Sequence, residues 1–399
     1  MTNQDLYTKD KENYLPTFNR FPIAFIKGKG SRLWDADGKE YIDLLAGIAV
    51  NNVGHCHPKV VKAIQEQAAQ LMHISNFFVS PQQVALSELL VKISGLNRVF
   101  LTNSGAESVE GAIKIARRYA HKHGKGGKVI SMQNSFHGRT LATIATGQEK
   151  YQQGFGPIPT GFAQVPFNDL AAVQAAIDKD TAAVIVEPIQ GEGGVVPAEK
   201  AYLEGLRKLC DEQGVLLIFD EIQCGIGRTG NWFAKDHYGV QPDIMTLAKG
   251  LGGGAPIGAL LCNEKVASAI EFGDHGTTFG GNPLVAASAL ATIEVINEEQ
   301  LCKRATETSE WLQGKLAELI AKHDELESVR GLGLMLGVKM KSEAKPIVMR
   351  LLEEGIVANA TAVNILRLVP ALNISRDELN IFLEKLDEIL SETIVSSQI

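Results

Sequence analysis

Between about residues 55 and 295, short apolar runs alternate with longer stretches that have the periodicity of amphipathic helices. The runs are continuously apolar, which is typical of strands that are covered on both faces of a mostly parallel sheet. Alternation of such strands with helices predicts an α/β fold. We expect strands at 99–102, 129–132, 182–186, 215–219, 244–247 and 259–262, and helices at 104–122, 199–212 and 283–298.

The two flanks of this region have a different pattern. Residues 20–45 contain short strand-like segments around Asp37-Gly38, a hairpin turn signal. After about residue 300 we expect a long helix, short strands at 334–340 and 365–369, and a closing helix from Ser375.

These patterns predict two domains in the 399-residue chain, in line with its length. We expect a large α/β domain at 55–295, and a smaller α+β domain assembled from 1–54 together with 296–399.

Charge and cysteine content restrict the classes of function. The chain has 39 basic and 46 acidic residues and a net charge of −7, so no basic face for nucleic acid is indicated. Its five cysteines are scattered and form no CxxC pair, which favours the reducing cytoplasm. Residues 1–11 lack the apolar stretch of a signal peptide, and no apolar run approaches the roughly 20 residues of a membrane helix. We expect a cytoplasmic protein with a small-molecule partner.

In an open α/β sheet, ligands bind beyond the carboxyl ends of the strands, so the residues after each apolar run are the first candidates for chemistry. The strand at 99–102 leads into Asn103-Ser104-Gly105-Ala106-Glu107 and then a helix. Small residues with free backbone N–H groups at a helix N-terminus can bind an anion. Ser104 and Glu107 also fit an ordinary capping box, which is the alternative interpretation.

Two further candidates follow neighbouring strands. Asp220 ends the run 215–219, and Lys249 follows 244–247 and precedes a glycine-rich stretch. A desolvated lysine beside flexible glycines is a candidate amine nucleophile, although most lysines are solvated surface residues. Asp220 is a poor metal ligand because no His or Cys stands at ligand spacing. An anion cradle, a buried acid and a lysine together suit a phosphorylated, cationic aldehyde, and pyridoxal phosphate is such a molecule.

Two other motifs do not support a cofactor. The spacing of His55-Cys56-His57 is too tight for a closed metal site, and Pro58 indicates a helix start, so no metal is expected. The glycines at 331–337 miss the GxGxxG spacing of a dinucleotide site.

Six segments in order along the chain closely resemble the class III pyridoxal-phosphate aminotransferases, and within them the acetylornithine aminotransferase group. The segments are 100–107 (FLTNSGAE), 136–140 (FHGRT), 187–194 (EPIQGEGG), 219–223 (FDEIQ) with 225–230 (GIGRTG), 247–250 (LAKG) and 277–283 (TTFGGNP). The resemblance covers nearly the whole chain. It implies a fold-type-I transferase that binds pyridoxal 5'-phosphate and works as a homodimer with sites at the subunit interface.

The resemblance also assigns the cofactor site. Lys249 would bind the cofactor covalently and move the reacting proton, and Asp220 would pair with the ring nitrogen. Gln223 would contact the ring oxygen and Phe136 would stack on the ring. The remaining assigned residues are Gly105 and Ala106 for the phosphate, Glu221 and Ile222 beside Asp220, and Thr278 for the phosphate of the neighbouring subunit.

Substrate selection is implied by the same resemblance. Arg139 would hold the carboxylate far from the reacting carbon, and Thr277 would lie at the substrate site. Arg367 would receive the carboxylate of glutamate beside that carbon. Glu192 would neutralise Arg367 for the amine donor, which has no carboxylate there, and would swing aside for glutamate. An ordinary ion pair is the alternative interpretation of Glu192 and Arg367.

The expected reaction is the transfer of the terminal amino group of N2-acetyl-L-ornithine to 2-oxoglutarate, which gives N-acetyl-L-glutamate 5-semialdehyde and L-glutamate in arginine biosynthesis. Succinylornithine, N-succinyl-diaminopimelate, ornithine and 4-aminobutyrate are alternative donors. A nicotinamide oxidoreductase and a non-catalytic binding protein are the alternative classes. Thr277 stands where relatives usually have serine, and 75–79 lacks a tyrosine often found near there, so both departures bear on the substrate.

Overall fold

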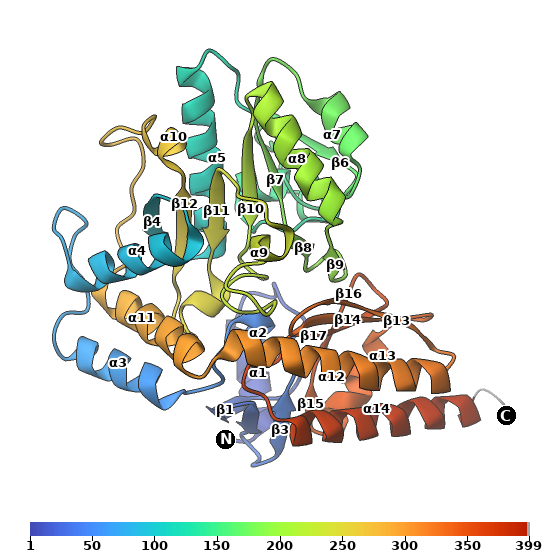
Figure 1. The fold of residues 1–399 in the computed structure, drawn as a ribbon. Coiled ribbons are helices and arrows are strands. Elements are labelled where there is room, and N and C mark those ends of the chain that lie inside the picture. Colours follow the sequence, from blue (N-terminus) through green and yellow to red (C-terminus); the bar gives the residue numbers. More distant parts are fainter. Residues whose placement is uncertain (397–399) are drawn as a thin grey trace.

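The computed structural model describes residues 1–396. The chain folds into two lobes (Figure 1). One lobe is built around a seven-stranded sheet, and the other contains two four-stranded sheets.

The large sheet has the strand order β4-β12-β11-β10-β7-β5-β6. All neighbouring strands are parallel except β12, which is antiparallel to both β4 and β11. This confirms the mostly parallel sheet predicted from the sequence. Its strands are β4 (Arg98–Thr102), β5 (Lys128–Met132), β6 (Phe162–Val165), β7 (Thr181–Val186), β10 (Leu216–Asp220), β11 (Ile244–Leu247) and β12 (Gly258–Cys262).

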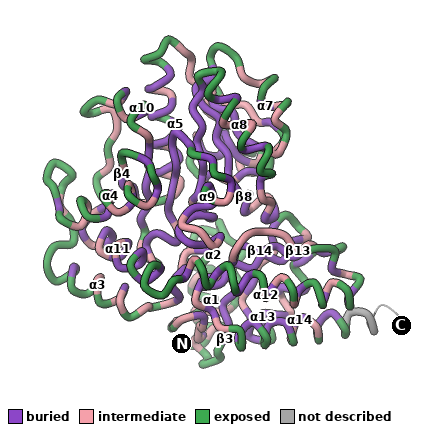
Figure 2. Tube along the Cα trace, in the orientation of Figure 1, coloured by how far each residue is buried: buried purple, intermediate pink, exposed green. Residues whose placement is uncertain are grey.

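Helices cover both faces of this sheet, as the apolar runs require. In β10, Leu216 and Ile218 pack into the cluster that contains the apolar side of α5 (Gly105–Lys122). Leu217 and Phe219 pack into the opposite cluster with α8 (Lys200–Gln213). Successive side chains of a strand point to opposite faces, so both faces are buried. Figure 2 shows the strands as a buried layer between the helices.

The other lobe joins the two ends of the chain. In its first sheet, of order β1-β2-β3-β15, Ile356 of β15 pairs in parallel with Ile42 of β3. The second sheet has the order β13-β14-β17-β16. We propose that the two lobes correspond to domains at 55–295 and at 1–54 with 296–399. The strands are β1 (Phe25–Lys29), β2 (Arg32–Asp35), β3 (Glu40–Asp43), β13 (Leu326–Leu332), β14 (Met335–Met340), β15 (Ile356–Val357), β16 (Asn359–Thr361) and β17 (Ile365–Leu368).

The remaining elements are further helices, two 3-10 turns and a short hairpin. No helix in residues 1–396 combines the length and the apolar character needed to cross a membrane. The other helices are α1 (Asn3–Asn13), α2 (Ala46–Ala49), α3 (Pro58–Ala68), α4 (Pro81–Ser94), α6 (Leu141–Ala145), α7 (Leu170–Ala176), α9 (Lys235–Tyr238), α10 (Glu264–Ala267), α11 (Pro283–Glu298), α12 (Leu301–Lys322), α13 (Lys345–Glu353) and α14 (Arg376–Ser396); η1 (Glu149–Tyr151) and η2 (Lys249–Leu251) are 3-10 turns, and β8 (Ile189–Gln190) and β9 (Val196–Pro197) form a hairpin.

The expected strands and helices of the large lobe are all present, and their ends differ from the expected ones by at most one residue. The Asp37-Gly38 turn joins β2 to β3 as expected. Strand β6 was missed. It lies at the edge of the sheet and most of its residues are only half-buried, so it lacks the continuous apolar run of the central strands.

Candidate active site

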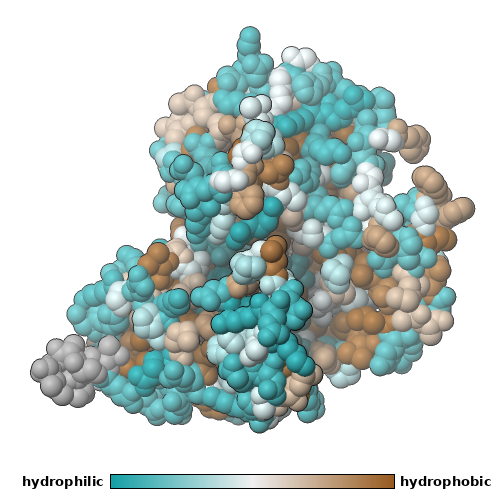
Figure 3. Space-filling model, turned by 180° about the vertical axis from the view of Figure 1, so that it is seen from behind, coloured by the Kyte–Doolittle hydropathy of each residue, from teal (hydrophilic) through white to brown (hydrophobic). Residues whose placement is uncertain are grey.

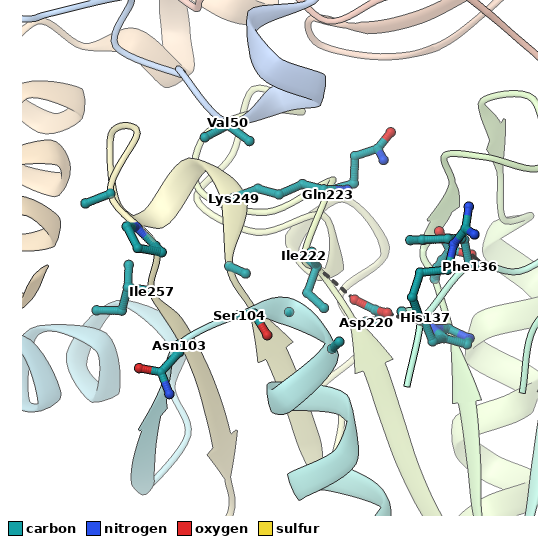
Figure 4. Close-up of a pocket in the computed structure, with 18 of the residues that line it drawn as sticks. Val50, Asn103, Ser104, Phe136, His137, Asp220, Ile222, Gln223, Lys249 and Ile257 are labelled. Atoms are coloured by element: carbon teal, nitrogen blue, oxygen red, sulfur yellow. Dashed lines mark hydrogen bonds and ion pairs between the residues drawn. The ribbon is translucent and has the colours of Figure 1, made fainter. Parts of the chain in front are cut away.

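A cavity of about 430 Å³ lies at the carboxyl ends of the parallel strands. Figure 4 shows Asp220, Lys249, Phe136 and Ser104 converging on it from different elements. Small-molecule sites typically have volumes of roughly 300–1,000 Å³. The cavity is therefore large enough for a cofactor-sized ligand, and it lies where an α/β sheet is expected to bind one.

Asp220 is a buried, firmly held carboxylate at the end of β10. It is 3% exposed. Its Oδ2 lies 2.6 Å from Nδ1 of His137, and its Oδ1 accepts hydrogen bonds from the backbone N–H of Ile222 (3.0 Å) and from the Thr246 hydroxyl (3.2 Å). Burial alone would lower the pKa of His137, but the hydrogen bond and charge of Asp220 raise it overall. These donors fix the carboxylate against the cavity, where it can pair with a cationic ring.

Lys249 begins η2 and is separated from β11 by one residue, Ala248. Its backbone has a positive φ of 41°, a conformation that is rare for a residue with a side chain and that often occurs at functional sites. Burial lowers the pKa of the Lys249 amine below its usual value, although the charge of Glu192 opposes this effect. A lower pKa increases the fraction of unprotonated amine, which is the form that reacts with an aldehyde.

The N-terminus of α5 provides an anion site as well as a cap. The Ser104 hydroxyl accepts from the backbone N–H of Glu107 (3.2 Å), and the Glu107 carboxylate accepts from the N–H of Asn103 (2.8 Å). The N–H groups of Gly105 and Ala106 have no acceptor within residues 1–396, and both residues line the cavity. The helix dipole also favours a negative group here. Capping and anion binding are thus compatible.

Glu187 holds the loop that carries Phe136, and sequence reasoning missed this role. Its two carboxylate oxygens accept from the backbone N–H groups of Phe136 (3.1 Å) and Gly191 (3.2 Å). Burial raises the pKa of Glu187 to about 7. Gly138 brings the same loop against α5: its φ is +139°, and a Cβ there would lie 2.8 Å from the Cβ of Ala106.

Glu192 and Arg367 form an ion pair beside the cavity. Arg367 is completely buried, whereas the Glu192 side chain is 25% exposed. Nη1 of Arg367 also donates to Gln223 (3.3 Å), which lines the cavity. Burial alone would raise the pKa of Glu192, but the Arg367 guanidinium outweighs this effect and lowers it. Glu192 lines a second cavity, of about 510 Å³.

Arg139 lines the main cavity and rests on an aromatic ring. Its guanidinium lies 3.9 Å from the ring centroid of Tyr151 and 5.5 Å from that of Phe136. It makes no ion pair within the described chain, so its charge is available to a ligand carboxylate. Tyr151 was not singled out from the sequence, because an aromatic residue in a polar segment gives no local signal.

Five residues assigned to the site do not line the main cavity: the paired Glu192 and Arg367, and Glu221, Thr277 and Thr278. The Glu221 carboxylate accepts from the backbone N–H groups of Ala234 (2.6 Å) and Lys235 (2.8 Å), and Glu221 does not line the cavity. Thr277 and Thr278 line a different cavity, of about 730 Å³. Thr277 is linked to the main site only through Asn103, whose amide donates to its hydroxyl (3.1 Å).

The chain matches aminotransferases over nearly its whole length. A family model described as aminotransferase class-III matches residues 15–390. The acetylornithine aminotransferase of Methanocaldococcus jannaschii is 49% identical over 395 residues, which cover 98% of this chain and 99% of that protein.

Solved structures agree with the sequence comparison. The ornithine aminotransferase of Toxoplasma gondii superposes with a TM-score of 0.95 at 35% identity, covering 99% of this chain and 96% of that one. The N-acetylornithine aminotransferase of Stenotrophomonas maltophilia superposes with a TM-score of 0.84 at 37% identity, covering 98% and 99%.

Proposed function

This chain belongs to the class-III aminotransferase family, and on that premise we propose that it transfers the terminal amino group of N2-acetyl-L-ornithine to 2-oxoglutarate. The products are N-acetyl-L-glutamate 5-semialdehyde and L-glutamate. The observation that carries the proposal is the convergence of Lys249, Asp220 and the free N–H groups of α5 on one cavity. The names of the relatives from M. jannaschii and S. maltophilia support the choice of donor.

The side chains of the cavity fit pyridoxal 5'-phosphate. When bound, this cofactor supplies a conjugated ring that takes up the electron pair released from the substrate carbon. Lys249 would hold it covalently and carry the reacting proton on its Nζ. The Asp220 carboxylate would pair with the ring nitrogen, and a charge-assisted bond of this kind contributes about 1.5–3 kcal/mol. Phe136 would pack on the ring, and Gln223 would contact the ring oxygen.

The phosphate group fits the start of α5. The N–H groups of Gly105 and Ala106 donate to it, and Ile222 supports this turn, because a Cβ on Gly105 would lie only 2.9 Å from its side chain. Thr278 donates to the phosphate bound by the partner subunit. Thr277 would contribute to the substrate site through Asn103, which lines the main cavity and donates to the Thr277 hydroxyl.

Charge decides which substrates the site accepts. Arg139 binds the distal carboxylate of both substrates. For the amine donor, Glu192 keeps the buried charge of Arg367 neutralised; for glutamate, Glu192 turns toward solvent and the substrate carboxylate takes its place. An unpaired buried Arg367 would cost several kcal/mol, so one site can serve both substrates only if Glu192 moves.

The surroundings of Arg139 favour an acylated donor. Lys150, which lines the adjoining cavity, lies over the same Tyr151 ring, 4.9 Å from its centroid, so a second cation lies close to Arg139. The α-ammonium of ornithine would be repelled there, whereas the neutral amide of acetylornithine is not. Ornithine is nevertheless the second candidate, because the T. gondii enzyme superposes so closely.

The enzyme is proposed to be a cytoplasmic homodimer. Apolar side chains gather on the flank that carries α3 and α4, at the right in Figure 3. Phe77 is 95% exposed there, and Phe78, Val79 and Phe272 are exposed too. Patches of this kind mark protein interfaces.

The test compares kcat/KM for acetylornithine, succinylornithine, N-succinyl-diaminopimelate, ornithine and 4-aminobutyrate with 2-oxoglutarate as acceptor. We expect acetylornithine to be the best donor. Equal or faster turnover of ornithine would overturn the donor assignment. The purified protein should also absorb visible light through its bound cofactor, and Lys249→Ala should lose both the covalent attachment and the activity; a colourless wild-type protein would overturn the cofactor assignment.

A further inference from the structure

We propose that Asn359 is a positioning residue that keeps Arg367 ready for the second carboxylate of glutamate or 2-oxoglutarate once Glu192 has moved aside. The inference rests on the proposed exchange of Glu192 for a substrate carboxylate. It adds a residue that determines how well one of the two substrates binds.

The register of the small sheet places Asn359 against Arg367. Strands β16 and β17 are antiparallel, and Asn359 pairs directly with Arg367. Residues directly opposite on neighbouring strands have their side chains on the same face. Here Nε of Arg367 donates to Oδ1 of Asn359 at 3.1 Å.

The other donors of Arg367 explain why this bond matters. Nη1 donates to Glu192 and to Gln223, and Nη2 has no acceptor within residues 1–396. When Glu192 leaves, Asn359 and Gln223 are the remaining acceptors. Asn359 takes only Nε and Gln223 takes one hydrogen of Nη1, so Nη2 and the Nη1 hydrogen that Glu192 releases are available to a bidentate carboxylate. Because its amide is neutral, Asn359 fixes the guanidinium without cancelling the charge that attracts the substrate.

The same strand also restricts how Glu192 can move. The Thr361 hydroxyl, on β16, donates to the backbone carbonyl of Glu192 at 2.8 Å. The main chain of Glu192 is therefore anchored, while its side chain is partly exposed and lines the adjoining cavity. Strand β16 thus holds Arg367 through Asn359 and the backbone of Glu192 through Thr361, which leaves the Glu192 side chain as the moving part.

The test uses two variants and a matched control. Asn359→Leu keeps a similar volume and removes the acceptor, and Asn359→Ala removes the side chain in case leucine prevents folding. Asn364→Ala is the control, because Asn364 lies on the same hairpin and its amide donates to the carbonyl of Met340 (2.8 Å), away from Arg367. All are purified with cofactor bound.

Binding is measured by calorimetry with two inert probes. Glutarate carries two carboxylates, as 2-oxoglutarate does, and N-acetyl-L-norvaline is acetylornithine without its reacting amine. We expect both Asn359 variants to raise the Kd of glutarate about tenfold, the effect of losing one hydrogen bond to a charged group, and to leave the Kd of N-acetyl-L-norvaline within about twofold. Single-turnover rates with glutamate should fall and those with acetylornithine should not. Asn364→Ala should change none of these.

A fourth variant separates this inference from the proposed function. Glu192→Gln should tighten glutarate binding, because the probe no longer competes with a carboxylate for Arg367. If Glu192→Gln leaves glutarate binding unchanged, the proposed exchange is wrong, and the role of Asn359 falls with it. If Glu192→Gln behaves as expected but the Asn359 variants bind glutarate like wild type, or weaken both probes equally, the role of Asn359 alone is overturned.

Discussion

Replacing Tyr151 by leucine removes the ring on which the Arg139 guanidinium rests. The cation lies 3.9 Å from the ring centroid, and Arg139 is exposed. A cation–π contact at an exposed site contributes about 0.5–1 kcal/mol. At about 1.36 kcal/mol per factor of ten, its loss corresponds to a change in affinity of about two- to fivefold. Because both substrates use Arg139, KM should rise by this factor for acetylornithine and for 2-oxoglutarate alike.

Steady-state kinetics with each substrate varied in turn measures this effect. Loss of binding that is equal in the ground state and the transition state raises KM and leaves kcat unchanged. Tyr151→Phe is the matched control, because it keeps the ring and removes only the hydroxyl, so it should retain wild-type KM values.

Two results would refute the reasoning. If Tyr151→Phe raises KM as much as Tyr151→Leu does, the hydroxyl and not the ring supports Arg139. If Tyr151→Leu raises KM for only one substrate, Arg139 does not bind the carboxylate that the two have in common.

Three further outcomes are expected. In Gly191→Ala, the new Cβ would lie 2.3 Å from Oε1 of Gln223, so this movable side chain must leave its hydrogen bonds. The melting temperature should therefore stay the same while activity falls about tenfold, and an unchanged activity would contradict this expectation. Burial lowers the pKa of Lys249, so the rate of pyridoxal phosphate capture by the cofactor-free protein should rise with pH and level off below pH 10.5. Absorbance follows the capture, and a rate that still rises above pH 10.5 would indicate a solvated amine. Phe77→Asp should shift the sedimentation of the protein from dimer to monomer, and a persistent dimer would place the interface elsewhere.

Local sequence patterns were sufficient for every strand of the large sheet except β6, and for the centre of the site. Strands β10 and β11 lie between other strands and helices, so all their residues are buried and, apart from Thr246 and the terminal Asp220, apolar. The polar residue that ends such a run must then lie at the edge of the sheet. Asp220 and Lys249 were found in this way, and both line the cavity.

The residue after Asp220 was assigned to the site because of its position in the sequence, but it does not line the cavity. Glu221 was grouped with Asp220, but consecutive side chains leaving a strand point in opposite directions. Its carboxylate therefore accepts hydrogen bonds from the backbone N–H groups at the start of α9, and Glu221 does not line the cavity.

Only the tertiary structure decided the contacts between distant segments. Glu192 and Arg367 are 175 positions apart, and no spacing rule links them; family resemblance had to supply the pair. Asn359 and Tyr151 had no signal at all, because their roles depend on the register of β16 against β17 and on the packing of η1 beside Arg139. Apolar periodicity reports burial along one element, whereas hydrogen bonds and ring contacts depend on how separate elements meet in space.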